Sequence, residues 1–138
     1  MSTGEQNLKQ IVQRLQPQLH EGAYVFCTVE SRQPMPSEWC VMMFCEAEGT
    51  TIILRREHAD ELGLSYEYVS SWITLQVHSA LSSVGLTAVF STALTAAGIS
   101  CNVVAGYYHD HLFVPEDLAS AALQTLSDLS ASPAPDSF

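Results

Sequence analysis

The sequence has few basic residues. Only five of its 138 residues are Lys or Arg, against fifteen Asp and Glu, and the formal net charge is -10. Nucleic acids and anionic membrane surfaces are bound through clustered positive charge, which this chain does not supply. We therefore expect neither nucleic acid nor a membrane as a partner, and we attribute the acidity to solubility.

Long apolar runs and targeting signals are also missing. No apolar run approaches the roughly 20 residues that cross a bilayer, and the start, MSTGEQNLKQ, has neither a basic nor an apolar signal region. We expect a cytoplasmic protein. The four cysteines (Cys27, Cys40, Cys45 and Cys101) form no CxxC pair, and a reducing compartment favours buried, reduced thiols.

Catalytic and nucleotide-binding signatures do not occur. The chain has no G-x-S-x-G elbow, no phosphate loop and no G-x-G-x-x-G. His78 lies near Ser79, Ser82 and Ser83, but proximity along the chain does not orient a base, and capping of a helix by Ser82 or Ser83 is the simpler interpretation. We predict no catalytic residue, no cofactor and no enzyme.

What the sequence does contain is a globular core. Apolar residues make up 47% and charged residues 14%, which indicates a folded chain. In the first half, the spacing of apolar residues predicts a helix over 7–19, ended or kinked by Pro17, and the composition predicts strands over 23–29, 39–45 and 51–55. The segment 46–49 is typical of a hairpin, and 57–62 of a short helix capped by Gly63.

The second half has clearer periodicity. Alternation from Trp72 to His78 predicts a half-buried strand, and apolar spacing predicts a helix from Leu86 that stops at Gly98. Strands over 100–107 and 111–114 and a helix from Pro115 follow, the last with an inward stripe of Leu118, Ala122, Leu126 and Leu129.

The order strand, helix, strand, strand, helix is the ferredoxin-like order without its last strand. We expect the N-terminal half to cover the edge left open. The predicted fold is therefore α+β, with two ferredoxin-like halves, a mainly antiparallel sheet and helices on one face. The predicted division is residues 1–68, residues 69–130 and a disordered tail over 131–138.

One segment resembles a known family. Residues 71–114, SWITLQVHSALSSVGLTAVFSTALTAAGISCNVVAGYYHDHLFV, resemble the ACT-domain family, in particular small bacterial ACT proteins that carry HDHLFVP. The N-terminal half, with GAYVF and EAEGTTIIL, fits the same family less specifically. The resemblance implies two ACT-like halves and a regulatory protein that binds an amino acid or a related metabolite, and it implies homodimers as a frequent assembly.

The resemblance places the ligand at the loop between the first strand and the first helix. A helix N-terminus suits a carboxylate, glycine permits close backbone approach, and an Asn amide can both donate and accept. The implied ligand-binding residues are His78, Ser79, Ser82, Val84, Gly85, Leu86, Cys101 and Asn102. The loop lacks the Asp followed by Pro-Gly of many amino-acid-sensing ACT domains, so ligand identity stays open, as does a homo-oligomer with a vestigial site.

The string His109-Asp110-His111 allows a different chemistry. Two imidazoles and a carboxylate are good ligands for zinc, but a third or fourth ligand must come from another His or a Cys. A structural role in a hairpin turn is the favoured interpretation. A metal-dependent hydrolase or a transferase that uses this string is the enzymatic alternative.

Overall fold

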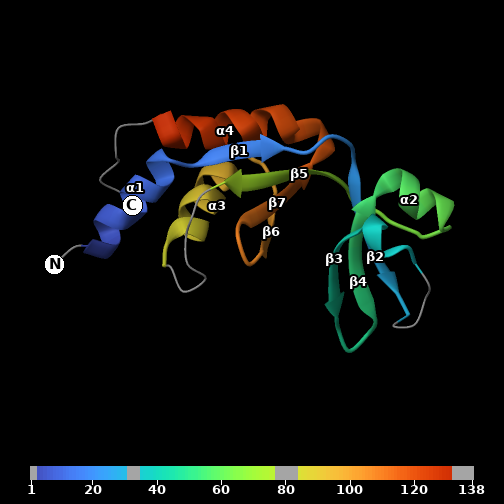
Figure 1. The fold of residues 1–138 in the computed structure, drawn as a ribbon. Coiled ribbons are helices and arrows are strands. Elements are labelled where there is room, and N and C mark those ends of the chain that lie inside the picture. Colours follow the sequence, from blue (N-terminus) through green and yellow to red (C-terminus); the bar gives the residue numbers. More distant parts are fainter. Residues whose placement is uncertain (1–2, 31–34, 77–83, 132–138) are drawn as a thin grey trace. The chain divides into compact units, whose positions relative to one another are not determined.

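The computed structural model describes residues 3–30, 35–76 and 84–131, with side chains from residue 8 onward. The fold is α+β, as predicted (Figure 1). The chain divides into two compact units: unit 1 contains residues 1–20 and 72–138, and unit 2 contains residues 21–71. The first twenty residues thus pack with the C-terminal part of the chain. The predicted domain boundary after residue 68 stays a prediction.

Unit 2 is built on a small antiparallel sheet. Its elements are β2 (Tyr24–Val29), the 3-10 turn η1 (Ser37–Trp39), β3 (Cys40–Cys45), β4 (Thr50–Arg55) and α2 (Arg56–Glu61). The strand β5 (Val69–Gln76) begins in this unit and pairs with β2, which gives the order β3-β4-β2-β5. This is the ferredoxin-like order, and between β2 and β3 the described residues form only η1 where that fold has a helix.

Local sequence explains the unit 2 elements. The predicted 46–49 hairpin is confirmed, because the Glu46 amide donates to the Gly49 carbonyl at 2.9 Å. The predicted strand over 39–45 begins one residue later, since Trp39 belongs to η1. Apolar side chains that alternate along β2 and β4 meet Ala59 of α2 in one core, which consists of Val25, Cys27, Val29, Ile52, Leu54 and Ala59.

Unit 1 completes the same order with a strand from the far end of the chain. Its elements are α1 (Thr3–Gln13), β1 (Gln16–Leu19), the end of β5, α3 (Leu86–Ala96), β6 (Asn102–Ala105), β7 (Asp110–Pro115), the 3-10 turn η2 (Glu116–Leu118) and α4 (Ala119–Ala131). β1 pairs antiparallel with β5, and β5, β7 and β6 follow in order. β1 therefore supplies the strand that the predicted order lacked.

The prediction of one helix over 7–19 is wrong in its second half. The helix ends at Gln13 and residues 16–19 form β1. Pro17 cannot continue a helix, and the edge of β5 offers the following residues backbone partners instead. Near the other end, Pro115 ends β7 and α4 begins only after η2, so the predicted helix start was four residues early.

The core of unit 1 lies between its sheet and its helices. Ile73 and Leu75 of β5 are fully buried and pack with Phe90 of α3 and Leu126 of α4. The predicted alternation of β5 is confirmed, because Trp72 and Thr74 point to the opposite face of the sheet, where they contact His111. No helix of the described residues is long and apolar enough to span a bilayer.

Candidate functional site

The predicted ligand loop is described only in part. His78, Ser79 and Ser82 lie outside the described residues. Among the others, the side chain of Val84 is 89% exposed, whereas Leu86 is buried in the unit 1 core. Ser83, the other serine considered as a cap, also lies outside the described residues. The prediction that Ser82 or Ser83 caps the helix is wrong for the N-cap position, because Gly85 occupies that position.

Gly85 has the geometry that a close approach requires. Its φ of 103° lies in the region that side-chain-bearing residues rarely adopt, and its carbonyl accepts from the Val89 amide at 3.1 Å to begin α3. A Cβ added there would lie 3.0 Å from Cδ2 of Leu8. The first amides of α3 have no intrahelical acceptor, and glycine brings no side chain to cap them. The N-terminal end of α3 can therefore accept an anionic group.

The other two predicted residues lie at the start of β6. Asn102 is exposed and pairs in register with Phe113 of β7. Cys101 is partly buried against the unit 1 core, and burial raises the pKa of its thiol to about 11. The thiol is thus neutral at physiological pH and packs as an apolar group. That these residues and the α3 N-terminus form one pocket stays a prediction.

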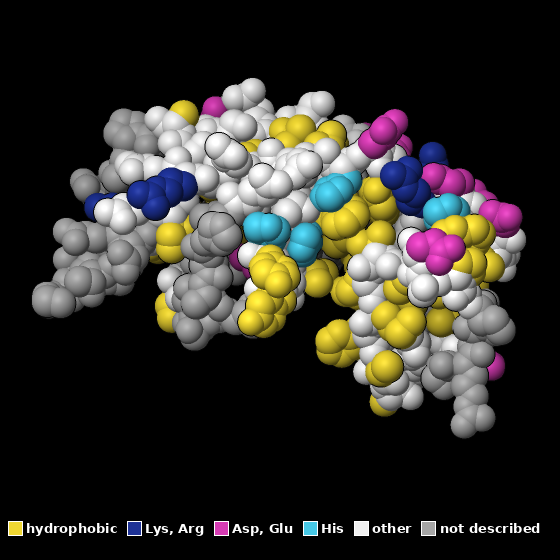
Figure 2. Space-filling model, viewed as in Figure 1, with side chains coloured by type: hydrophobic (Ala, Val, Ile, Leu, Met, Phe, Trp, Pro, Cys, Tyr) yellow, Lys and Arg dark blue, Asp and Glu magenta, His cyan; other side chains and the backbone are white. Residues whose placement is uncertain are grey.

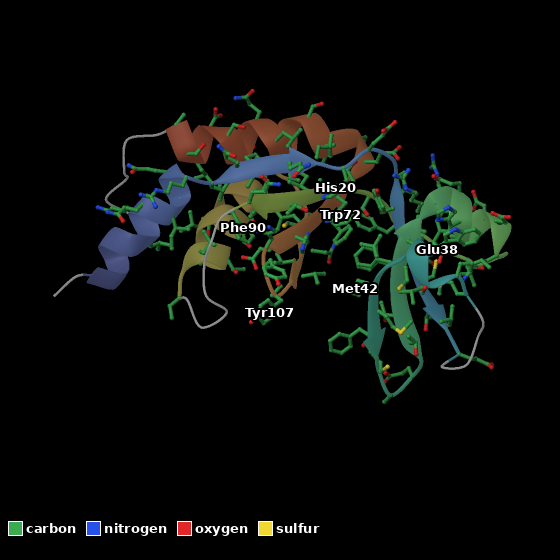
Figure 3. All side chains as sticks on the ribbon, in the orientation of Figure 1. His20, Glu38, Met42, Trp72, Phe90 and Tyr107 are labelled. Carbon is green, nitrogen blue, oxygen red and sulfur yellow. The ribbon has the colours of Figure 1, made fainter. Side chains whose placement is uncertain are left out.

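A second group of side chains was not predicted as a unit. It comprises His20, Trp72, Thr74 and His111 on the sheet face of unit 1 that lies away from the helices, and we call it the His–Trp cluster. The rings of His20 and Trp72 are stacked, with centroids 3.5 Å apart and an interplanar angle of 8° (Figure 3). Thr74 Oγ1 lies 2.7 Å from Nε2 of His20 and 3.0 Å from Nδ1 of His111.

Hydrogen bonding fixes the protonation of His111. Trp72 Nε1 donates to His111 Nδ1 at 3.0 Å. An indole N–H can only donate, so Nδ1 must carry no proton and the neutral ring holds its proton on Nε2. Gly106 allows this placement, because a Cβ at position 106 would lie 3.0 Å from Nε2 of His111.

Electrostatics agree with a neutral His111. Desolvation by burial, followed by the repulsion of His109, lowers the pKa of His111, and Asp110 opposes this shift. Burial also raises the pKa of Asp110. Thr74 is buried, so its hydroxyl serves the hydrogen-bond network and is not presented to solvent as a nucleophile. The cluster therefore connects β5, β7 and the residue that follows β1.

The sequence held only part of the signal for this cluster. His111 was singled out in the string 109–111, and Trp72 and Thr74 by their alternation, but nothing in the spacing joined them to His20. The structure shows His109 in the turn before β7 and His111 within the strand. The described residues contain no group of three His, Cys, Asp or Glu side chains placed to hold a metal ion.

The cysteines differ from one another in exposure. All four are free thiols; Cys27 is buried, Cys40 and Cys101 are intermediate, and Cys45 is exposed. The prediction of buried thiols is therefore wrong for Cys45. It is the last residue of β3, directly before the 46–49 hairpin.

Comparison with known proteins identifies the family. Two family models described as ACT domain match residues 3–71 and residues 67–128. No curated protein matches the chain. A crystal structure from Vibrio cholerae, titled as a protein of unknown function and possible transport protein, is 44% identical, covers 92% of this chain and 98% of its own, and has a TM-score of 0.80.

More distant structures share the fold. A protein from Agobacterium tumefaciens is 17% identical over 85% of this chain and 90% of its own, with a TM-score of 0.64. The ligand-free regulatory subunit of aspartate kinase from Thermus thermophilus is 12% identical over 82% of this chain and 95% of its own, with a TM-score of 0.59. From the matched residues and the 44% identical relative, this chain belongs to the ACT-domain family and carries two ACT domains in tandem.

Proposed function

We propose that this chain is a non-catalytic regulatory protein that binds an amino acid at the N-terminal end of α3. The observation that carries the proposal is Gly85, which holds the N-cap position in a left-handed conformation and has no side chain of its own to cap the first turn of α3. The partial positive charge of a helix N-terminus favours the carboxylate that every amino acid has.

Family and fold support the same role. ACT domains are regulatory modules, and one solved structure of this fold is the regulatory subunit of an aspartate kinase. The ligand would contact Gly85 through its carboxylate, and Asn102 on β6 could accept from its amino group. Cys101 and Leu86 would then support the site from the core and not touch the ligand, since both pack into unit 1.

A thermal-shift screen of the twenty amino acids tests the proposal. One amino acid should stabilise the wild type, because a ligand at about 100 times its dissociation constant adds about 2.7 kcal/mol, or several degrees. Gly85→Arg should abolish that shift, because an added side chain at the N-cap strains the positive φ, crowds Leu8 at 3.0 Å and so displaces the first turn of α3. A flat screen with the wild type would contradict an amino-acid ligand.

Gly98→Arg is the matched control. Gly98 follows the other end of α3, also has a positive φ, of 75°, and no atom lies within 4 Å of a Cβ added there. Both variants add a charge at a glycine of positive φ, but Gly85→Arg also brings a Cβ within 3.0 Å of Leu8 Cδ2, so the stability of each unliganded variant is measured first. If Gly85→Arg kept the same ligand-induced shift as Gly98→Arg, the ligand would bind elsewhere. A homodimer and a cytoplasmic location remain predictions; light scattering tests the former.

A further inference from the structure

The chain crosses between the two units twice. Unit 2 contains residues 21–71, so it is inserted into unit 1 after His20 and before Trp72. These two residues of unit 1 are joined to each other. The His20 amide donates to the Trp72 carbonyl at 2.9 Å, and the two rings stack with centroids 3.5 Å apart. Backbone and side chains of unit 1 thus hold the two crossings together.

Hydrogen-bond chemistry gives the His–Trp cluster a consistent arrangement of protons. Nδ1 of His111 carries no proton, because it accepts from Trp72 Nε1. The single proton of the Thr74 hydroxyl then points to the same nitrogen, and Thr74 Oγ1 accepts from Nε2 of His20. Both Thr74 and Trp72 therefore depend on His111 Nδ1 as an acceptor.

Protonation has different effects on the two histidines of the cluster. A proton on Nδ1 of His111 would face the indole N–H of Trp72 across 3.0 Å, so two donors would oppose each other. The indole relieves this conflict by leaving the position in which it stacks on His20. A proton on Nδ1 of His20 leaves its Nε2–H donating to Thr74, and a cationic ring is attracted to an indole face. The charge of His111 therefore decides whether the stack persists.

Solvent can reach the cluster. His20 and His111 are each partly exposed, as is His109 in the turn before β7. Figure 2 accordingly shows histidine side chains at the surface of unit 1. A change in the pH of the solution can therefore reach His111 without unfolding of the sheet.

The groups around His111 place its titration below that of an ordinary histidine. Burial, followed by the repulsion of His109, lowers the pKa of His111 from 6.5, and Asp110 opposes this shift. His20 reaches His111 only through the Thr74 hydroxyl.

The neighbouring strands add no further titration near neutral pH at the positions that contact or face His111. β5 contributes Trp72 and Thr74, and β6 places Val104 opposite His111. None of these three side chains changes charge near neutral pH. A response of the cluster between neutral and mildly acidic pH therefore belongs to the histidines.

We propose that the His–Trp cluster is a pH-sensitive clamp on the two crossings between the units, closed while His111 is neutral and opened when its Nδ1 takes up a proton. In the closed state, Trp72 is bonded to His111 and stacked on His20. In the open state, the indole turns away and the bond from the His20 amide to Trp72 breaks more often. The opening is local to this end of the β1–β5 ladder, and it does not depend on ligand binding at α3.

Nuclear magnetic resonance of the full-length protein between pH 7.5 and 5 tests the clamp. The indole N–H signal of Trp72, assigned with a Trp39→Phe variant, should move upfield with a midpoint below pH 6.5, because it loses its acceptor. The hydrogen-exchange protection factor of the His20 amide should fall about tenfold over the same range. An indole signal that does not move, or that moves while the protection of His20 stays constant, would overturn the proposal.

Two variants identify the sensor. His111→Asn keeps an oxygen that can accept from Trp72 and does not titrate, so both changes should disappear. His20→Phe keeps a flat ring for the stack and does not titrate, so the indole transition should remain. If the transition persisted in His111→Asn and vanished in His20→Phe, His20 would be the sensor and the clamp as proposed would be wrong.

Neighbouring charges supply matched controls. His109→Asn removes a repulsion and should raise the midpoint of the indole transition, whereas Asp110→Asn removes the opposing attraction and should lower it. Midpoints that respond to neither substitution would assign the titration to another group. The amides of Phe90 and Leu126 in the unit 1 core should keep their protection throughout. Loss of their protection together with that of His20 would mean global unfolding and would reject a local clamp.

Discussion

At the scale of single residues, environment separates side chains of the same type. Both described tryptophans stack on a histidine, Trp72 on His20 and Trp39 on His58, the latter with centroids 4.1 Å apart. Each pair joins residues distant in sequence within one unit. The indole of Trp72 also fixes the tautomer of His111, which no property of an isolated histidine determines.

The cysteines give a prediction at this scale. Cys45 should react with iodoacetamide much faster than Cys101 at neutral pH, because Cys45 is exposed whereas burial raises the pKa of Cys101 to about 11. Peptide mapping by mass spectrometry at several times after addition measures both rates in one sample. Comparable rates in the folded protein would mean that Cys101 is not packed as the structure has it; in denaturant the two rates should converge.

At the scale of elements, β1 shows how a weak local signal yields to a tertiary partner. Its residues, QPQL, have no strand-like composition. Pro17 nonetheless fits, because β5 is the one strand that pairs with β1 in the described part of the chain, and proline is tolerated where its missing N–H would point away from the ladder. The His20 amide donates to the Trp72 carbonyl of β5 at 2.9 Å. Because amides alternate along a strand, the amide of Gln18, two residues earlier, also points toward β5.

Gln18→Pro should therefore destabilise the protein by roughly 1–3 kcal/mol, the cost of a lost hydrogen bond that leaves its partner unsatisfied. Urea denaturation followed by circular dichroism measures this cost. Gln18→Ala removes the side-chain bond to Gln76 but keeps the amide, and should cost less. Leu19→Pro places proline where the backbone amide points away from β5. If it lowered the free energy of unfolding as much as Gln18→Pro does, the register between β1 and β5 would be refuted.

At the scale of the whole molecule, stability should depend on pH through the sheet of unit 1. Burial lowers the pKa of His111 below its ordinary value of 6.5. The unfolded chain then binds a proton at a higher pH than the folded chain. The contribution of neutral His111 to stability is complete above pH 6.5 and is lost as the pH falls toward its lower folded pKa. Asp110, whose pKa burial raises from 3.8, acts in the opposite direction at lower pH.

His111→Asn isolates this effect, because the Asn oxygen can accept from Trp72 Nε1 and does not titrate. Between pH 7.5 and 5.5, the wild type should lose more free energy of unfolding than His111→Asn in urea titrations. Parallel pH profiles of the two proteins would show that His111 does not carry the dependence.

Particular elements show what sequence alone determined. The alternation of β5, the apolar stripe of α4 and the glycines after α2 and α3 are local signals, because periodicity and backbone freedom act within a few residues. They sufficed for the α+β class, the ferredoxin-like order and the ACT resemblance. They also placed Gly85 at the start of α3, which is the part of the candidate site that local chemistry specifies.

Tertiary structure alone decided the rest. β1 became a strand because β5 offered an unpaired edge, not because residues 16–19 favour one. The His–Trp cluster formed because β1, β5 and β7 are neighbours, although His20 and His111 are far apart in the chain. Cys45 is exposed because β3 lies at an edge. Each outcome depends on contacts between distant segments, and composition and spacing do not record such contacts.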